Sequence, residues 1–544
     1  MSEVQGHGGV HAVAVARAHG VETMFTLSGA HVFPMYDGAV TATPPMRLLD
    51  VRHEQSAVFA AEATGKLTRR PGLAVLTAGP GVTNGVSAMA QASFSGSPLV
   101  VVGGRAPLAR WGTGALQEFD HVPVVSSFCR YAATAPSPES VASTLDAAFV
   151  AAGSPHRGPA FVDVPMDVFF MPSTVEHSGV STPKGADPDP DALAAVAALL
   201  AEAQHPVLIY GSDVWADGAE EAACTLTEAT GIPTMTNGMG RGIIPAGHRL
   251  LVTKARRAAL AGADLVVVVG TPLDFRLGYG ELGSAKVVHI ADSAGQVSSH
   301  ARLAGSVSGD LTTILRGLSE ALAGRPGGTA WDEWAATLAD EVNAANARDA
   351  ALLHAQADPV HPARIYGELL PRLAEDATVI GDGGDFVSWA GKFVEPARPG
   401  HWLDPGPFGC LGAGPGAALA ASLLRPSAQV VLLLGDGAAG FALADIDTMV
   451  RHRLPVVMVM GNNGAWGLEK GPMQMLYGYD VVADLAPGTR YDKVARALGA
   501  DGELVTDPAQ IGPALDRAFA SGMPYLVNVV TDVGTAYPRS TFGI

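Results

Sequence analysis

The chain has 544 residues, a formal net charge of -18 and 48% hydrophobic residues. This length exceeds what one hydrophobic core organises, so we expect three or four domains. The acidic balance argues against nucleic acid or an anionic membrane as the main partner. Three cysteines (Cys129, Cys224 and Cys410) make no metal or disulfide pattern, and the N-terminus shows no signal-peptide pattern. Both features favour a cytoplasmic protein.

Short apolar runs that end in glycine, such as VVVGG, LVVVVG and VVLLLG, alternate with helix-like segments. Such runs suit buried parallel strands and are too short to cross a membrane. The βαβ rhythm predicts an α/β fold with three doubly wound parallel-sheet domains. We expect these domains at residues 1–177, 192–325 and 358–544. A linker rich in Pro, Gly, Ser and charge occupies 178–191, and a polar helical segment follows at roughly 330–357.

In the N-terminal block, His53-Glu54 precedes an Ala-rich helical run, and a strand-like LAVLTA and the loop GPGVTN (79–84) follow. A carboxylate in the first turn of a helix is stabilised by the helix dipole. Glu54 taken alone is therefore more often structural than catalytic.

In the C-terminal block, Gly435-Asp436-Gly437 follows one apolar run, and Asn463 stands 27 positions after Asp436, behind another apolar run. The pattern predicts strand, glycine turn, helix, strand and polar loop. Asp436 and Asn463 should then lie at the carboxyl ends of two strands, where open α/β sheets bind ligands. A carboxylate and an amide oxygen beside glycine-rich turns suit a hard cation that carries a diphosphate.

Taken in order, His53-Glu54, the GPGxTN loop and the distant GDG…NN resemble the acetolactate synthase-like superfamily of thiamine diphosphate (ThDP) enzymes over nearly the whole chain. The resemblance implies a pyrimidine-binding, a central and a diphosphate-binding domain. It also implies active sites between subunits, so we expect a homodimer or homotetramer in which Glu54 faces the partner's Asp436.

By this resemblance, Glu54 holds the cofactor's aminopyrimidine in the tautomer that removes the thiazolium C2 proton. That role calls for an apolar pocket and a raised pKa of the carboxyl group. The segment FGCLGAG (408–414) resembles a GTMGxG pattern. Its bulky residue, here Leu411, would wedge the cofactor into a V, and the Gly409 carbonyl would accept from the cofactor's amine.

The resemblance places the metal and the diphosphate in the C-terminal block. Mg²⁺ is expected at Asp436, Asn463 and the backbone carbonyl of Ala465. Further diphosphate contacts are expected from Gly383, Gly384, Asp385, Gly437 and Ala438.

Three segments bear on the reaction. Ser28-Gly29-Ala30-His31 resembles benzaldehyde lyase, in which that His faces the substrate and can relay a proton, although a helix-capping His is equally consistent. GALQEF resembles GAFQEF of 2-hydroxyacyl-CoA lyases, but Gln117 also matches an active-site Gln of synthases. After Asn463, Lys470 and Pro472 stand where synthases carry Arg and Trp. Glu469 is a candidate second acid/base, or a surface group.

In the central block, Lys254-Ala255-Arg256-Arg257 and Leu273-Asp274-Phe275-x-Leu277 resemble the CoA-using branch, whereas acetolactate synthases carry a GxxFDDR-like pattern. Arginines and helix N-termini bind phosphate well, although a solvated basic helix face would also explain the first motif. In that branch the central domain holds ADP, and FAD is the less expected nucleotide. Candidate nucleotide contacts are Arg256, Asp292 and Asp310.

These resemblances favour a 2-hydroxyacyl-CoA lyase, which cleaves the C1–C2 bond of an acyl-CoA substrate through a ThDP ylide to formyl-CoA and an aldehyde or ketone. The expected catalytic residues are Glu54, His31, Gln117, Leu411 and Glu469. Acetolactate synthase and a benzaldehyde lyase-like hydroxyketone lyase or carboligase remain alternatives. The C-terminal AYPRSTFGI is expected to dock on the surface rather than to cover CoA, with Arg539 as a phosphate contact in the second case.

Overall fold

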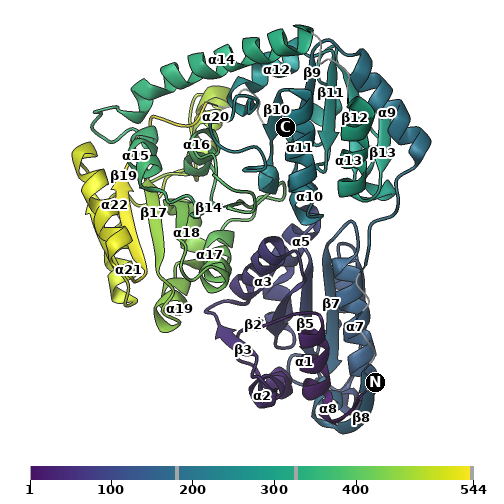
Figure 1. Ribbon diagram of the computed structural model, residues 1–544. Coiled ribbons are helices and arrows are strands. Elements are labelled where there is room, and N and C mark those ends of the chain that lie inside the picture. Colours follow the sequence, from purple (N-terminus) through teal and green to yellow (C-terminus); the bar gives the residue numbers. More distant parts are fainter. Residues whose placement is uncertain (1, 178–179, 181–182, 324–328, 539–544) are drawn as a thin grey trace.

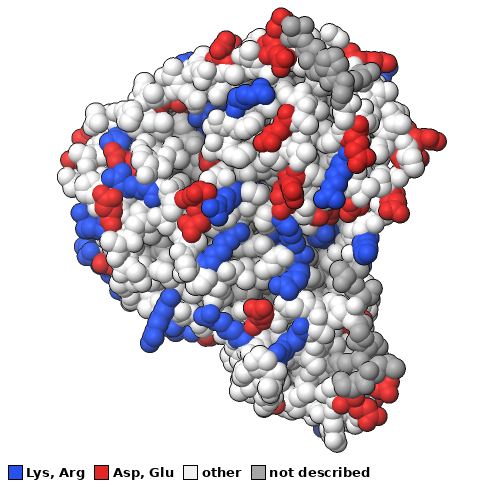
Figure 2. All heavy atoms as spheres, in the orientation of Figure 1, with Lys and Arg blue, Asp and Glu red and all other residues white. Residues whose placement is uncertain are grey.

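The computed structural model describes residues 2–177, 180, 183–323 and 329–538 and contains three parallel sheets with helices packed on them (Figure 1). This arrangement confirms the predicted α/β fold of three doubly wound sheets. Across those described ranges, no helix combines the length and the apolar composition needed to span a membrane. On the face shown in Figure 2, Lys and Arg side chains are interspersed with Asp and Glu.

The N-terminal sheet has the strand order β3-β2-β4-β5-β7-β6 and is parallel throughout. Its core strands are buried along their whole length because helices cover both faces. The strands are β2 (Thr23–Thr26), β3 (Arg47–Asp50), β4 (Gly72–Leu76), β5 (Leu99–Arg105), β6 (Tyr131–Thr134) and β7 (Pro159–Pro165). The helices are α1 (Gly8–Ala18), α2 (Phe33–Thr41), α3 (Glu54–Thr68), α4 (Pro80–Asn84), α5 (Val86–Phe94), α6 (Val122–Val125), α7 (Ser140–Gly153) and α8 (Met166–Phe170). An antiparallel ribbon joins β1 (Ser2–His7) to β8 (Pro172–His177).

The central sheet has the order β10-β9-β11-β12-β13 and is also parallel. The strands are β9 (Pro206–Tyr210), β10 (Thr234–Thr236), β11 (Leu265–Val269), β12 (Lys286–Ala291) and β13 (Gly305–Ser308). The helices are α9 (Pro190–Glu202), α10 (Ser212–Ala216), α11 (Glu220–Thr230), α12 (Arg256–Gly262) and α13 (Leu311–Leu322). The long α14 (Thr329–Leu353) then runs from this domain to the C-terminal one along the top of Figure 1, in the segment expected to be helical.

The C-terminal sheet has the order β15-β14-β16-β17-β19-β18. The strands are β14 (Thr378–Asp382), β15 (Trp402–Leu403), β16 (Val430–Gly435), β17 (Val456–Asn462), β18 (Asp501–Val505) and β19 (Tyr525–Val530). The helices are α15 (Pro362–Leu369), α16 (Asp385–Phe393), α17 (Ala413–Leu424), α18 (Asp436–Ala442), α19 (Asp445–Arg451), α20 (Gly467–Tyr477), α21 (Tyr491–Ala497) and α22 (Ile511–Ala520). The single helix expected between Asp436 and Asn463 is thus two short helices, α18 and α19.

Helices α3 and α17 bring the N- and C-terminal domains together, and their apolar residues belong to one shared core. At Gly416 a Cβ atom would lie 2.7 Å from Cβ of Phe59, so the two helix backbones approach closely. Asp445 adds a polar tie, because its carboxylate accepts from the backbone N–H of Arg52 at 2.9 Å and from Ser56. The N-terminus of α3, with Glu54, is thereby fixed against the C-terminal domain.

Candidate active site

A hollow of about 70 Å³ opens at the carboxyl ends of β14, β16 and β17, and we call it the C-terminal hollow. Its walls contain ten of the residues that the sequence singled out, brought together from separate segments. These residues are Gly383, Gly384, Asp385, Leu411, Asp436, Gly437, Ala438, Asn463, Ala465 and Glu469. Because β16 and β17 are neighbouring parallel strands, Asp436 and Asn463 meet at the same sheet edge, as the spacing predicts.

Asp436 is buried at the first position of α18 and faces backbone donors. Its Oδ2 accepts from the N–H of Gly464 at 2.9 Å. Burial raises the pKa of this carboxyl group to about 6, although nearby backbone N–H groups act in the opposite direction. Asn463 Oδ1 lies beside it and accepts from the N–H of Ala465 at 3.1 Å. A hard cation bound here would favour the ionised carboxylate and take amide and carbonyl oxygens as further ligands.

Glycines keep the floor of the C-terminal hollow free of side-chain atoms. At Gly437 a Cβ atom would lie 2.5 Å from the ring of Trp466, and at Gly384 it would collide with Leu468. Gly383 adopts a φ of +116°, which side chains disfavour. A flat glycine floor next to a carboxylate and an amide oxygen fits a diphosphate with its cation.

Asp385 lies in the hollow wall, but its carboxylate also holds the C-terminal tail. Its Oδ1 accepts from the N–H of Tyr537 at 2.6 Å, and the Tyr537 ring packs edge-on against Trp389. The described part of the tail therefore docks on α16. Arg539 lies outside the described residues.

On the N-terminal domain, Glu54 is buried at the first position of α3 and is paired by Asn84. Asn84 Nδ2 donates to Glu54 Oε2 at 3.0 Å. The pairing joins the two ends of the sequence motif, because Asn84 closes the GPGVTN loop. The neighbouring Gln55 Nε2 reaches the carbonyl of Leu411 at 3.4 Å, so the N-terminus of α3 abuts the loop that lines the hollow.

His31 and Gln117 gather around Gly79. His31 is buried, and its Nδ1 lies 3.2 Å from Thr77 Oγ1. Burial lowers the pKa of His31, and the nearby His121 acts in the same direction, so its imidazole is neutral near pH 7. Gln117 has a φ of +59°. A Cβ atom added at Gly79 would lie 3.0 Å from the Cβ atom of Gln117. The strained backbone at Gln117 is thus held by the glycine loop.

Among the described residues, the lining of the C-terminal hollow comes only from the stretch between Gly383 and Glu469. Glu54, His31 and Gln117 lie outside that lining. Beside Gln117, the Leu116 side chain is 78% exposed, and Phe119 is 41% exposed. Within one chain the N-terminal group and the C-terminal hollow are therefore separate, and we call them the two candidate half-sites.

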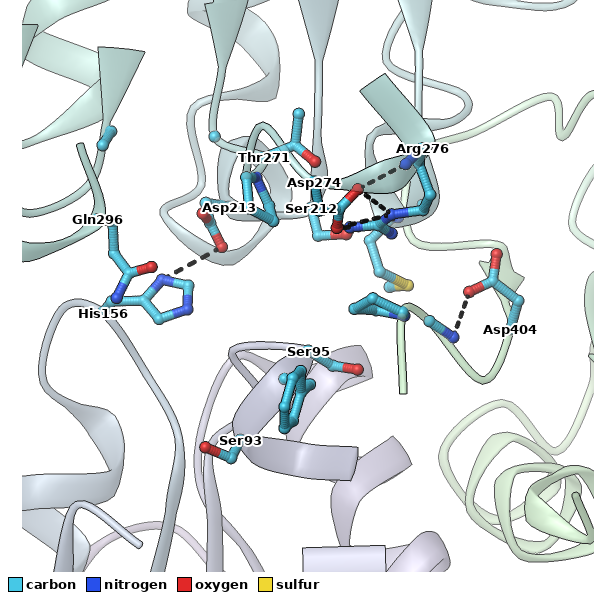
Figure 3. Close-up of a pocket in the computed structure, with 18 of the residues that line it drawn as sticks. Ser93, Ser95, His156, Ser212, Asp213, Thr271, Asp274, Arg276, Gln296 and Asp404 are labelled. Atoms are coloured by element: carbon cyan, nitrogen blue, oxygen red, sulfur yellow. Dashed lines mark hydrogen bonds and ion pairs between the residues drawn. The ribbon is translucent and has the colours of Figure 1, made fainter. Parts of the chain in front are cut away.

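A larger cavity of about 490 Å³ lies where all three domains meet (Figure 3). Ser212, Asp213, Thr271 and Asp274 reach into it from the central domain, and Ser93 in α5 and Ser95 just after it face them. Arg276 lies on the wall and forms a charge-assisted pair with Asp274, Nη2 to Oδ2 at 2.7 Å. The volume falls in the range of small-molecule sites.

His156 forms an ionic link across one side of this central cavity. Its Nδ1 lies 3.0 Å from Asp292 and 3.6 Å from Asp213, so an N-terminal-domain residue is paired with two central-domain carboxylates. Burial lowers the pKa of His156, but the two carboxylates outweigh it and raise the pKa to about 9. The link is therefore charged at neutral pH.

The three nucleotide contacts expected from the sequence do not meet at this cavity. Arg256 is directed at the backbone carbonyl of Arg276 and stands behind the wall. Asp292 is paired with His156, and Asp310 caps α13 by accepting from Thr313. Asp274 and Arg276, which lie on the cavity wall, belong to the segment that begins at Leu273. In the sequence this segment indicated only a resemblance to the CoA-using branch and did not predict a cavity. The pairing of Asn84 with Glu54 was not predicted, although Asn84 is the last residue of the GPGVTN loop, and Trp466, which follows Ala465 directly, was missed as well.

Comparison with known families agrees with this division. Residues 7–124 match the thiamine pyrophosphate enzyme N-terminal TPP binding domain, residues 193–318 the central domain, and residues 382–529 the C-terminal TPP binding domain. Thiamine pyrophosphate is another name for ThDP. Each half-site therefore lies in, or directly beside, a matched cofactor-binding domain.

Two mycobacterial relatives are 53% identical over 528 residues, which cover 96% of this chain and 95% of theirs. They are a "Probable acetolactate synthase" from Mycobacterium bovis and "Acetolactate synthase large subunit IlvG" from Mycobacterium tuberculosis. The human "2-hydroxyacyl-CoA lyase 2" is 33% identical over 573 residues, covering 96% of this chain and 90% of the relative. The chain belongs to the ThDP-dependent enzymes, in their acetolactate synthase-like family.

Proposed function

We propose that this protein is an acetolactate synthase, which joins two pyruvate molecules with release of CO2. The observation that carries the proposal is the 53% identity to relatives of that name, against 33% to the lyases at the same coverage of this chain. This replaces the 2-hydroxyacyl-CoA lyase as the main hypothesis. The Asp274–Arg276 pair is compatible with the change, because these two residues match the Asp and Arg of the FDDR-like pattern of synthases, although Leu273 and Phe275 depart from it.

Bound ThDP supplies a thiazolium carbanion that adds to a keto carbon and accepts the electron pair of the bond that breaks. In this proposal Asp436, Asn463 and the Ala465 carbonyl hold Mg²⁺ and with it the diphosphate. Leu411, in the wall of the C-terminal hollow, would pack against the bound cofactor. Glu54, kept in place by Asn84, holds a proton at the aminopyrimidine nitrogen.

The neutral imidazole of His31 is suited to accept or return a proton at a substrate oxygen, and the Gln117 amide to orient a substrate carbonyl. Glu469 is exposed at the rim of the hollow and is a further proton donor or acceptor in the proposal. The central cavity, with Arg276 on its wall, is proposed to hold an adenine nucleotide, FAD or ADP.

A second copy of the chain is proposed to complete the site. The hollow is lined by the C-terminal domain, while Glu54, His31 and Gln117 lie outside it, and exposed Leu116 and Phe119 flank Gln117. A partner domain would cover these apolar side chains and supply the missing half-site.

The 2-hydroxyacyl-CoA lyase is the second candidate, because the loop after Asn463 departs from the synthase pattern, although it is also unlike the common lyase sequence. Lys470, which replaces the synthase Arg, pairs with Asp480 and Asp484 at 2.8 Å each. Its charge is thereby neutralised and is not free for the carboxylate of a second ketoacid. The lyase relatives match over nearly the whole chain as well.

The decisive test is a product assay on protein reconstituted with ThDP, Mg²⁺ and FAD. One sample receives pyruvate, and another receives short 2-hydroxyacyl-CoA thioesters with straight and branched chains. We expect acetolactate and CO2 from pyruvate and inert thioesters. Formyl-CoA with an aldehyde or ketone, and no product from pyruvate, would instead establish the lyase.

A further inference from the structure

Asp382 is a fully buried carboxylate at the end of β14, next to the glycine floor of the C-terminal hollow. Both of its oxygens accept from the start of α17: Oδ1 from the N–H of Gly412 and Oδ2 from the N–H of Gly414, each at 3.0 Å. These N–H groups stand at a helix start, where backbone donors lack partners inside the helix. One side chain on β14 thus anchors the beginning of a helix from a different part of the chain.

Local glycines allow this close approach. At Gly414 a Cβ atom would lie 2.6 Å from the Cβ of Asp382, and Gly412 has a φ of +81°. Gly412, one of the two residues that Asp382 holds, is the last residue of the loop Gly409–Gly412. Leu411, directly before it, lines the C-terminal hollow. The repeated glycines after Leu411 therefore serve the contact with Asp382 as much as the turn itself.

The burial of the Asp382 carboxyl group is unfavourable. Burial raises the pKa of Asp382 to about 7, and the two backbone N–H groups only partly offset this. The Cys410 thiol is a titratable neighbour, since Asp382 and Glu62 help to raise its pKa. Among the described residues, Asp382 accepts hydrogen bonds from the backbone of Gly412 and Gly414, and a carboxyl group buried with backbone donors alone costs stability. We therefore look for its benefit in the geometry that it imposes on α17.

We propose that Asp382 is a positioning residue for ThDP: by accepting from Gly412 and Gly414 it fixes the segment whose Leu411 side chain lines the hollow that would take the cofactor. The inference rests on ThDP binding, which belongs to the family, and not on the choice between synthase and lyase. It assigns a role to a residue that directly precedes the expected diphosphate contacts Gly383 and Gly384 but was not itself among the expected contacts.

The test compares Asp382→Asn with the wild type. An Asn side chain has the same shape, but its amide accepts from only one N–H and turns its own NH₂ against the other. We expect ThDP affinity at saturating Mg²⁺, read from the change in intrinsic tryptophan fluorescence on titration, to fall at least about ten-fold. The near-ultraviolet circular dichroism of the bound cofactor should change as well. Asp189→Asn, which alters the N-cap of α9, is the matched control and should leave both readouts unchanged.

A merely structural role would lower the melting temperature of Asp382→Asn and leave ThDP affinity and the cofactor's circular dichroism as they are. That result would overturn the proposal. If the variant does not fold, hydrogen exchange on the wild type decides: the amides of Gly412 and Gly414 should be protected before ThDP is added, and rapid exchange until ThDP binds would refute a preformed grip. Failure to turn over pyruvate would count against the synthase proposal only, because these readouts need no substrate.

Discussion

Gly437 and Gly440 lie in the same short helix, α18, but only one of them borders the C-terminal hollow. A Cβ atom at Gly437 would meet the Trp466 ring at 2.5 Å, whereas at Gly440 it would meet no atom within 4 Å. The pair therefore separates an effect on the hollow from an effect on the helix.

We expect Gly437→Ala to weaken ThDP binding at least about ten-fold, because Trp466 must shift into the hollow to make room. Gly440→Ala should bind ThDP as the wild type does and gain a few tenths of a kcal/mol from better helix propensity. Titration of each variant with ThDP at saturating Mg²⁺, together with its melting temperature, makes the comparison. Equal affinities in the two variants would show that the hollow at Gly437 does not hold the diphosphate.

At the residue scale, the sequence predicts candidate site residues that belong to short motifs. It does not predict contacts between residues that are far apart in the chain. Asp436, Asn463 and the glycines at 383 and 384 were readable because spacing and residue type point to one chemistry. Asn84 pairs with Glu54 across a strand and a helix, and Asp382 grips a loop about thirty positions away. Such contacts have no local pattern, because the folded sheet alone brings their partners together.

At the scale of elements, the apolar runs correctly predicted parallel sheets, since strands covered on both faces must be apolar throughout. The β1–β8 ribbon was not predicted, because its strands lie at opposite ends of the N-terminal domain and their pairing is antiparallel. The central cavity was not readable either, because its walls come from three domains. Arg256, expected on a nucleotide, is directed instead at a neighbouring backbone carbonyl.

His156, in the loop before β7, forms ion pairs with Asp213 after β9 and Asp292 after β12. This link between the N-terminal and central domains depends on the positive charge of His156. The pKa of His156 in the folded protein is about 9, above its ordinary value of 6.5. Its protonated form therefore stabilises the fold fully below pH 6.5, and this stabilisation is lost as the pH rises through about 9. Arg130 also faces His156 and opposes its protonation, while Asp213 and Asp292 favour it.

We expect His156→Gln to lower the melting temperature by about 2–4 °C at pH 6.5, because it removes the charged partner of the buried Asp292 carboxylate; burial raises the pKa of Asp213 to about 7, so Asp213 carries less of the negative charge there. The gap between variant and wild type should close above pH 9, where the wild-type histidine is neutral too. His354→Gln, on an exposed side chain just after α14, serves as the control and should show no pH-dependent gap. A gap that stays constant from pH 6 to pH 10 would mean that packing, not charge, is what His156 contributes.

At the scale of the whole molecule, the two half-sites raise the question of which chain completes the active site. Within one chain, Gln55 reaches Leu411, but the lining of the C-terminal hollow contains no N-terminal residue among those that the structure describes. In a symmetric dimer, the N-terminal surface of each subunit would face the C-terminal hollow of the other, which gives two equivalent sites. Substitutions of Glu54 and Asp436 placed on different chains can answer this question, because each residue is proposed to be indispensable to its own half-site.

Glu54→Gln and Asp436→Asn should each abolish most turnover when present alone. Co-expression with two affinity tags yields mixed dimers that carry one variant in each chain. If the site joins Glu54 of one subunit to Asp436 of the other, each mixed dimer has one site with both defects and one intact site, so it should recover about half of wild-type turnover. If each site lies within one chain, both sites of the mixed dimer carry a defect and no activity returns. Mixed dimers of differently tagged Asp436→Asn chains control for the tags, and their recovery of activity would show contamination by wild-type protein.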